Sequence, residues 1–293
     1  MQNKNEVKHL ILFFVISFGL CWIPIFVLYS AIGYKVWFNH VITATKFAPA
    51  FACILVRIIS NEKRDFYKLH LNLNNNLRYY VFSFILPLFF GITLALFINL
   101  LYGHWDTEEF KSHGTFISNM AQILNIYILP IFFSVFICLG EEIGWRDYMN
   151  QKLEKKFGIY GTCIIGGIIW GIWYLPLIVN GYQLGKDYSY FPFLGVLVVI
   201  LSCIFLQAIF MWLTKMTNSI YPAAIMHSLL YLRMYEVGFI FVCGVPIEQQ
   251  MKIDFLKVIS ILLIPEALIG MLCIANMVKK EKNNIGKNES LSN

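Results

Sequence analysis

The segment Cys138–Tyr148 reads CLGEEIGWRDY and follows directly on a long apolar run. Two adjacent carboxylates and an arginine therefore stand where the chain is otherwise hydrophobic. A charge inside hydrocarbon is costly, so ionisable residues at such depth usually face a cavity and mark function. On a helix Glu142 and Arg146 are four residues apart and share one face, whereas Glu141 is rotated by about 100° and points elsewhere. We expect Arg146 to pair with Glu142 and Glu141 to be left free as a general base; alternatively, all three side chains form a buried structural network that ties helices together.

The composition is that of a membrane protein. Hydrophobic residues make up 58% of the 293 residues and charged residues 14%, with a mean hydropathy of +0.65, which excludes a soluble domain with a polar surface. The net charge of +6 comes from Lys and Arg residues in short loops between apolar runs, so it sets orientation in the bilayer and does not indicate a nucleic-acid partner. The seven cysteines lie in or beside apolar segments without CxxC spacing, and we expect them to be small core residues.

Apolar runs long enough to cross a bilayer recur along the chain. They cover about 9–33, 41–60, 79–102, 120–145, 159–179, 191–214, 219–243 and 255–278. The predicted fold class is therefore all-α, a polytopic membrane bundle of about eight transmembrane helices. An even number places both termini on one side, and most Lys and Arg residues outside the runs fall on that side. By the positive-inside rule both termini are cytoplasmic, and we expect a multi-pass protein of a bacterial plasma membrane.

Helix geometry predicts which residue faces Glu141. The helix that carries Glu141 is expected to continue to a turn at Phe157 and Gly158, since glycine commonly ends a helix. Glu141 lies 16 residues before Phe157, and Tyr174 lies 16 residues after Gly158. At 1.5 Å per residue both are about 24 Å from the turn, so an antiparallel hairpin makes Glu141 and Tyr174 neighbours.

His227 lies well inside an apolar run, whereas the other histidines are in loops or at span ends. A lone membrane histidine can simply hydrogen-bond a backbone carbonyl of the next helix. The two glutamates elsewhere in the chain favour a catalytic role for His227 instead. Tyr231, four residues later, shares its helical face and would reach the same cavity. Arg233, Glu236 and Glu266 are further charges in the last two spans, and we expect them to be structural.

Three short segments together resemble the CPBP family, which includes the CAAX prenyl proteases of type 2 and bacteriocin-processing intramembrane endopeptidases. The segments are EEIGWR at 141–146, WGIWYLP at 170–176 and SIYPAAIMHSLLY at 219–231. The first meets the family's EExxxR motif with Glu141, Glu142 and Arg146. In the second, Tyr174 stands where the family has a histidine. In the third, His227 matches the motif while Tyr231 replaces an asparagine.

The resemblance implies an intramembrane endopeptidase that hydrolyses a peptide bond in a membrane-associated protein or peptide. In the family's mechanism the residues matching Glu141 and His227 activate water, which agrees with what a general base must do. The positions of Tyr174 and Tyr231 imply an oxyanion hole, where a tyrosine hydroxyl can still donate a hydrogen bond. The two longer side chains could instead fill the cavity and leave a binding protein without activity.

Three other functions stay open. The first is a catalytically impaired relative that binds a membrane peptide or acts in bacteriocin immunity. The second is a proton-coupled transporter with Glu141, Glu142 and His227 as its relay, which broken helices in related halves would favour. The third is a metallopeptidase, but one intramembrane histidine and no HExxH motif supply few ligands. We predict no metal and no cofactor, and we expect the lipid bilayer and a membrane-associated peptide as partners.

The chain is expected to have four parts. They are an N-terminal three-helix membrane region (1–120), a CPBP-like catalytic core (121–232), a C-terminal membrane region (233–278) and a disordered tail (279–293). The tail is assigned because polar residues, chiefly Lys, Asn, Glu and Ser, dominate after residue 278.

Overall fold

The computed structural model describes residues 2–32, 36–62, 68–102, 130–182, 184–232, 234–237 and 255–292. Its helices are α1 (Gln2–Ile32), α2 (Val36–Thr45), α3 (Ala48–Ile59), α4 (Leu77–Tyr102), α7 (Ile131–Glu142), η2 (Ile143–Met149), α8 (Asn150–Trp173), α9 (Leu175–Val179), α10 (Phe193–Thr217), α11 (Tyr221–Tyr231) and α14 (Phe255–Ser292). No strand occurs in these ranges, and the predicted all-α fold class is confirmed.

Six helical stretches of the described chain are long and apolar enough to cross a membrane. They are Asn5–Ala31, Asn39–Ile59, Leu77–Leu101, Ile131–Trp173, Phe193–Thr217 and Leu256–Gly286. The protein is therefore an integral membrane protein, as predicted, and the described residues contain six candidate spans where the sequence predicts eight. One reason is that the stretch from Ile131 contains two of the predicted runs. Another is that α11 has 11 residues, fewer than the roughly 20 needed to span a bilayer. Arg233 and residues 238–243 of the predicted run 219–243 lie outside the described residues. The count of eight stays a prediction.

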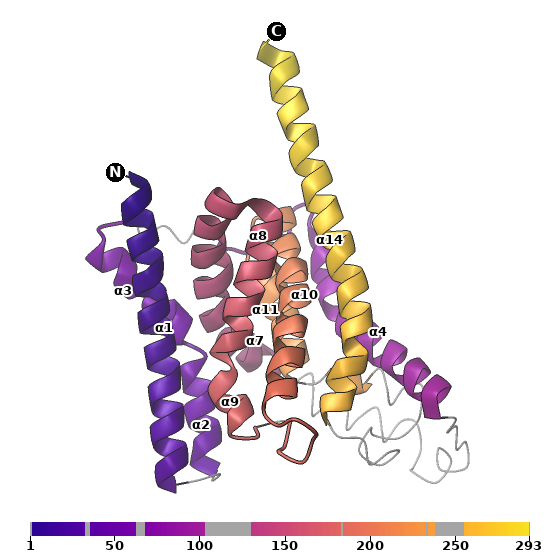
Figure 1. Cartoon of the computed structure of the whole chain (residues 1–293). Coiled ribbons are helices and arrows are strands. Elements are labelled where there is room, and N and C mark those ends of the chain that lie inside the picture. Colours follow the sequence, from indigo (N-terminus) through magenta and orange to yellow (C-terminus); the bar gives the residue numbers. More distant parts are fainter. Residues whose placement is uncertain are drawn as a thin grey trace.

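The predicted turn at Gly158 is confirmed. Gly158 has φ 64° and ψ −170°, a conformation that glycine reaches without a Cβ penalty. The turn divides the long helical stretch into two arms (Figure 1). One arm carries Glu141, and the other ends at Trp173, directly before Tyr174. The hairpin therefore places the WGIWYLP segment beside the EEIGWR segment.

Small residues allow α8 to lie close to α10. A Cβ on Gly167 would come within 2.4 Å of the Ile204 Cα atom, so any larger side chain would push the two helices apart. This close approach brings Trp170 of α8 against Phe210 of α10, with ring centroids 5.6 Å apart. Both aromatic rings belong to the wall of the site described below.

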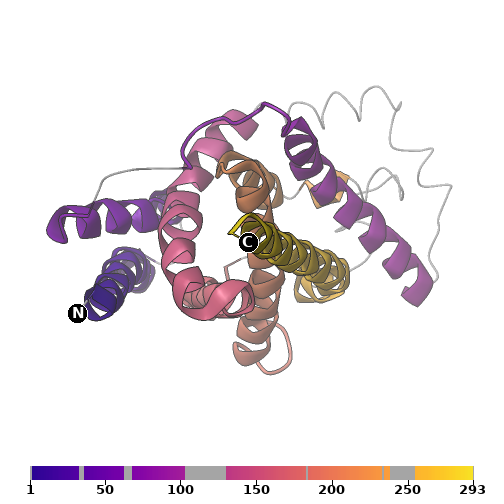
Figure 2. The same cartoon turned by 90° about the horizontal axis from the view of Figure 1, so that it is seen from above.

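The corner between α2 and α3 packs against two glycines of the arm that carries Glu141. A Cβ on Gly140 would come within 2.9 Å of the Lys46 carbonyl oxygen, and a Cβ on Gly144 within 2.3 Å of Pro49 Cβ. Glycines four residues apart are a common device for close approach of membrane helices. Figure 2 shows α1, α2 and α3 on one side of the α7–η2–α8 hairpin, with α14 and α4 on the other. Residues of this corner, in the N-terminal region, therefore lie against the segment that contains the EExxxR motif.

Glu62 connects α1 to α8 through a small polar cluster. It accepts a hydrogen bond from Lys152 Nζ at 2.8 Å, and its Oε1 atom lies 2.7 Å from His9 Nδ1. Burial raises the pKa of the Glu62 carboxyl, but the hydrogen bonds with Lys152 and His9 outweigh burial and hold the pKa below its ordinary value. The connection therefore depends on an ionised carboxylate.

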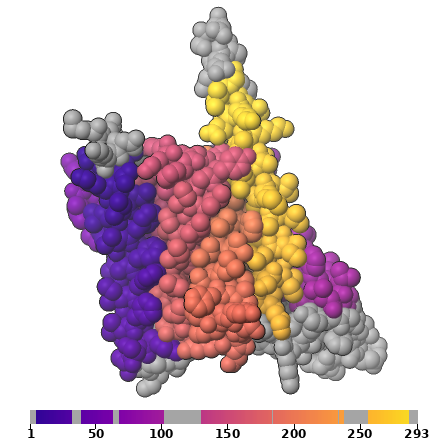
Figure 3. Space-filling model, viewed as in Figure 1, coloured from indigo at the N-terminus to yellow at the C-terminus, as the bar shows by residue number. Residues whose placement is uncertain are grey.

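The helix α14 continues to Ser292, into the segment 279–293 for which a disordered tail is predicted. Side chains 279–286 are exposed, and this end of the helix projects beyond the rest of the described chain (Figure 3). The division of the chain into four parts stays a prediction.

Candidate active site

Glu141 is fully buried among four polar side chains. Lys46 Nζ donates a hydrogen bond to Glu141 Oε1 at 2.7 Å, and Trp170 Nε1 donates to Oε2 at 3.0 Å. The Tyr174 hydroxyl lies 3.4 Å from Oε1 and 3.3 Å from Oε2. His227 Nε2 lies 3.8 Å from Oε1. The predicted contact between Glu141 and Tyr174 is confirmed.

The expectation that Glu141 has no charged partner is wrong, because Lys46 pairs with it. Lys46 precedes Glu141 by 95 residues, and its side chain is only 4% exposed. Two signals in the sequence point to this residue. Lys46 is a cation within an apolar run, where charges are rare and usually functional, and Gly140 with Gly144 marks a face on which another helix can approach closely.

Glu142 holds both His227 and Arg146. His227 Nδ1 lies 2.8 Å from Glu142 Oε1, and Arg146 Nε lies 3.1 Å from Oε2, so the predicted pairing of Glu142 with Arg146 is confirmed. An ionised carboxylate only accepts hydrogen bonds, so His227 Nδ1 carries a proton. In the neutral imidazole Nε2 is then the acceptor, and it faces Glu141. The second glutamate therefore orients the histidine toward the first.

The Arg146 guanidinium lies against two aromatic rings. Its Cζ atom is 4.3 Å from the Trp170 ring centroid and 4.8 Å from that of Phe210. None of its three nitrogens has an aligned hydrogen-bond acceptor among the described residues, although Nε is in ion-pair contact with Glu142. The buried cation is therefore balanced by one carboxylate and by the negative faces of two rings.

The helix that carries Arg146 departs from regular α geometry. Residues 143–149 form the π-helix η2, and the Asn150 N–H donates to Trp145 O, five residues back. Such wide turns often occur at functional sites. The sequence pattern does not predict this turn, because apolar spacing over seven residues does not distinguish it from an α-helix.

The two tyrosines meet the cluster in different ways. Tyr174 brings its hydroxyl to Glu141, whereas Tyr231 presents its ring face to Lys46, with Nζ 4.6 Å from the ring centroid. The structure thus brings the six predicted site residues into one group, with Lys46 as a seventh member. The six are Glu141, Glu142, Arg146, Tyr174, His227 and Tyr231. Their catalytic roles stay a prediction.

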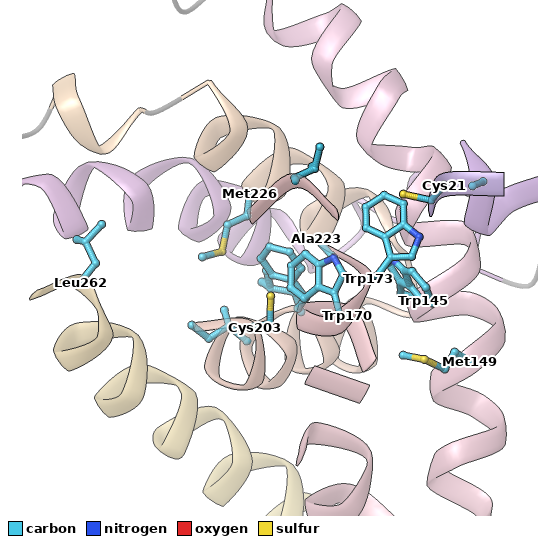
Figure 4. Packing of buried hydrophobic residues seen from close by; sticks show 14 of the residues in the cluster. Cys21, Trp145, Met149, Trp170, Trp173, Cys203, Ala223, Met226 and Leu262 are labelled. Atoms are coloured by element: carbon cyan, nitrogen blue, oxygen red, sulfur yellow. The ribbon is translucent and has the colours of Figure 1, made fainter. Parts of the chain in front are cut away.

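A cavity of about 190 Å³ lies beside this group. Lys46, Tyr174 and His227 form one part of its wall, and most of the other lining side chains belong to α10, α11 and α14. Figure 4 shows Trp170 and Cys203 close together, with Leu262 of α14 across from them. The cavity is smaller than the roughly 300–1,000 Å³ of a typical ligand pocket. Its size suits one or two amino-acid side chains.

Within the described ranges, no group of three or more His, Cys, Asp and Glu side chains is placed to hold a metal ion. The absence of a metal cofactor from the functional protein stays a prediction.

The fold and the site together define a helical membrane protein with a buried centre of two glutamates, a histidine and an arginine. The model of the family described as type II CAAX prenyl endopeptidase, Rce1-like, matches residues 123–232. The chain is also similar to CAAX prenyl protease 2 of Methanococcus maripaludis, at 40% identity over 45 residues, which cover 15% of this chain and 17% of the relative. Residues 123–232 therefore match a model of this family, and the resemblance carried by the three motifs is confirmed. Lys46 and α14 lie outside the matched segment.

Proposed function

We propose that the protein is an intramembrane endopeptidase that hydrolyses a peptide bond in a membrane-associated protein or peptide. The observation that carries this proposal is the approach of His227 Nε2 to Glu141 Oε1, at 3.8 Å, beside a cavity of about 190 Å³. A carboxylate and an imidazole at this separation can both hydrogen-bond one water molecule, at about 2.8 Å from each. The match of the core to a family of endopeptidases supports the same reaction class.

In the proposed reaction Glu141 is the general base. As the water oxygen attacks the carbonyl carbon of the substrate, one water proton passes to Glu141. The C–N bond then breaks, and the proton passes from Glu141 to the leaving amine. The products are a new carboxyl terminus and a new amino terminus. His227 holds the water, and Glu142 holds His227 in the required tautomer.

Tyr174 and Lys46 are the donors we assign to the oxyanion. Both contact Glu141, so both lie next to the place where the attacked carbonyl oxygen becomes negative. When Glu141 takes the proton its charge is lost, and the same charge appears on the substrate oxygen. Lys46 can then pair with the oxyanion without moving far. Removal of one such donor typically lowers the rate about 100- to 1,000-fold.

Cleavage of a broad peptide mixture by the purified protein in detergent tests the proposal. A peptide library from digested bacterial membranes is incubated with the protein, and new termini are identified by mass spectrometry. A second arm uses farnesylated peptides that end in Cys-aliphatic-aliphatic-X, because the relative is named as a CAAX prenyl protease. Glu141→Gln should abolish new termini, whereas Glu154→Gln, which loses only a contact with Lys215, should retain them. Equal cleavage by both variants contradicts the role of Glu141.

A second candidate function is a membrane peptide-binding protein without activity. One observation favours it, namely that Lys46 already neutralises Glu141 at 2.7 Å. This function predicts that peptides are retained on the immobilised protein and recovered uncleaved from wild type and Glu141→Gln alike.

We further propose that the protein lies in the plasma membrane of a bacterium with both termini in the cytoplasm. Cysteine labelling tests this orientation, because the six cysteines in the described ranges are buried. Asp187→Cys and Glu281→Cys introduce reporters at exposed positions, with Cys243 replaced by Ser in both proteins. An impermeant maleimide should reach position 187 in intact cells and position 281 only after permeabilisation. The reverse pattern contradicts the orientation.

A further inference from the structure

Glu266 is a buried carboxyl that the proposed hydrolysis does not use. It lies in α14, its exposure is 4%, and Ser202 Oγ donates a hydrogen bond to it at 2.7 Å. A carboxylate can accept about four hydrogen bonds, and within the described part of the chain no cation contacts this one. A buried charge without a partner is strongly unfavourable. A positively charged ligand would therefore find in Glu266 an acceptor whose charge no described side chain balances.

Glu266 lines the same cavity as the candidate catalytic residues. Most of the other side chains that line the cavity are apolar or aromatic, and many of them come from three helices. These include Leu206 and Phe210 of α10, Leu230 of α11 and Leu262 of α14. An occupant therefore meets a largely apolar wall and the Glu266 carboxyl.

The lysine and the histidine that line the cavity already have carboxylate partners. Lys46 pairs with Glu141 at 2.7 Å, and His227 pairs with Glu142 at 2.8 Å. Glu266 differs from them, because its contact is a neutral hydroxyl. The complementary occupant is a side chain with an aliphatic stem and a positive charge at its tip, since this stem buries apolar surface and the charge meets the carboxylate in a medium of low dielectric.

We propose that this cavity binds a cationic side chain of a membrane-associated peptide, as found in lysine, and that Glu266 determines this specificity. The inference deepens the proposed function and rests on it in one respect, namely that the ligand is a peptide. An apolar side chain in the same place leaves the carboxyl without a partner, and an acidic side chain is repelled. The cavity volume of about 190 Å³ admits one long side chain.

Peptide binding to immobilised protein in dodecyl maltoside micelles tests the proposal. The probes are three Leu/Ala peptides of about 20 residues, a membrane-spanning length, with a single central lysine, norleucine or glutamate. Norleucine keeps the stem of lysine and lacks the ammonium group. The proteins are wild type, Glu266→Gln, which keeps the size of the side chain and the contact with Ser202, and Glu281→Gln as a control on an exposed part of the same helix.

Wild type and Glu281→Gln should bind the lysine peptide about 10- to 100-fold more tightly than the norleucine peptide, the range typical of a hydrogen bond to a charged group. In Glu266→Gln this ratio should fall close to one. A wild-type ratio near one, or tightest binding of the glutamate peptide, overturns the inference even if Glu266→Gln does not fold. An unchanged ratio in a folded Glu266→Gln protein also overturns it.

Mass spectrometry of the same samples separates this inference from the proposed function. A preference for lysine that depends on Glu266, with all peptides recovered intact, supports the binding pocket and contradicts peptidase activity on these peptides. Cleavage with no preference between lysine and norleucine supports the peptidase and overturns the pocket.

Discussion

Lys46→Met and Glu141→Gln, made singly and together, test the strength of the buried ion pair that joins the N-terminal helices to the first motif. The Lys46 side chain is 4% exposed and the Glu141 side chain 0%. Removal of one partner of such a pair leaves the other charge buried without compensation, which costs about 3–5 kcal/mol. Each single variant should therefore lose about this much free energy of unfolding. In the double variant both charges are gone, and the expected loss is much smaller than the sum of the two.

A double-mutant cycle measures this coupling. Unfolding is followed by circular dichroism in mixed dodecyl maltoside and SDS micelles, and the coupling energy is the difference between the double loss and the summed single losses. We expect a coupling of at least about 2 kcal/mol. The cation–π contact of Lys46 with Tyr231 does not contribute to this value, because it is lost in both Met-containing variants and cancels in the cycle. The half-buried pair of Lys215 and Glu154 is the control, with an expected coupling of about 0.2–1 kcal/mol. Additive losses within about 0.5 kcal/mol for Lys46 and Glu141 would refute the reasoning.

Three further predictions concern single side chains. Arg146→Ala should lower the free energy of unfolding by about 3–5 kcal/mol, because it leaves the buried Glu142 carboxylate without its cation; a variant with wild-type stability in the same micelle titration would contradict the pairing. Tyr174→Phe should reduce single-turnover cleavage about 100-fold with little loss of stability, whereas Tyr231→Phe keeps the ring that faces Lys46 and should be close to silent; equal effects of the two changes would remove the distinction between hydroxyl and ring. Glu62→Gln should flatten the acid side of the stability profile: the lowered pKa of Glu62 stabilises the folded state above the ordinary value of about 4.3, and this contribution is lost as pH falls through the lowered pKa. If the melting temperatures of wild type and Glu62→Gln changed in parallel from pH 7 down to about pH 3, the stabilising role of the Glu62 carboxylate would be contradicted.

The hairpin could be predicted because it depends on local geometry. A helix has a fixed rise per residue, and Gly158 supplies the turn, so counting from the turn is enough to bring Glu141 and Tyr174 together. The pairing of Glu142 with Arg146 follows in the same way from a spacing of four residues. In both cases the partners lie on the same helix or on consecutive helices.

The partner of Glu141 could not be predicted by such counting. Lys46 reaches it from a corner that lies 95 residues earlier, and only packing between helices fixes that approach. The role of Glu266 depends in the same way on α14 meeting α10 at Ser202. From the sequence we expect a structural role for Glu266, because the sequence shows its charge and not the cavity that it lines. The π-helix is also not predicted from the sequence, because seven residues are too few for the apolar spacing to distinguish it from an α-helix.

The pairing of Lys46 with Glu141 has a consequence for how the protein is made. At about 5–20 residues per second a ribosome needs roughly 5–20 s to add the 95 residues that separate the two partners. During this time Lys46 has been synthesised and the carboxylate that pairs with it has not. A lone ammonium in hydrocarbon is costly, so its aliphatic stem must extend and carry the charge to the headgroup region. We therefore expect the corner between α2 and α3 to reach its final depth only after Glu141 has entered the membrane and paired with Lys46.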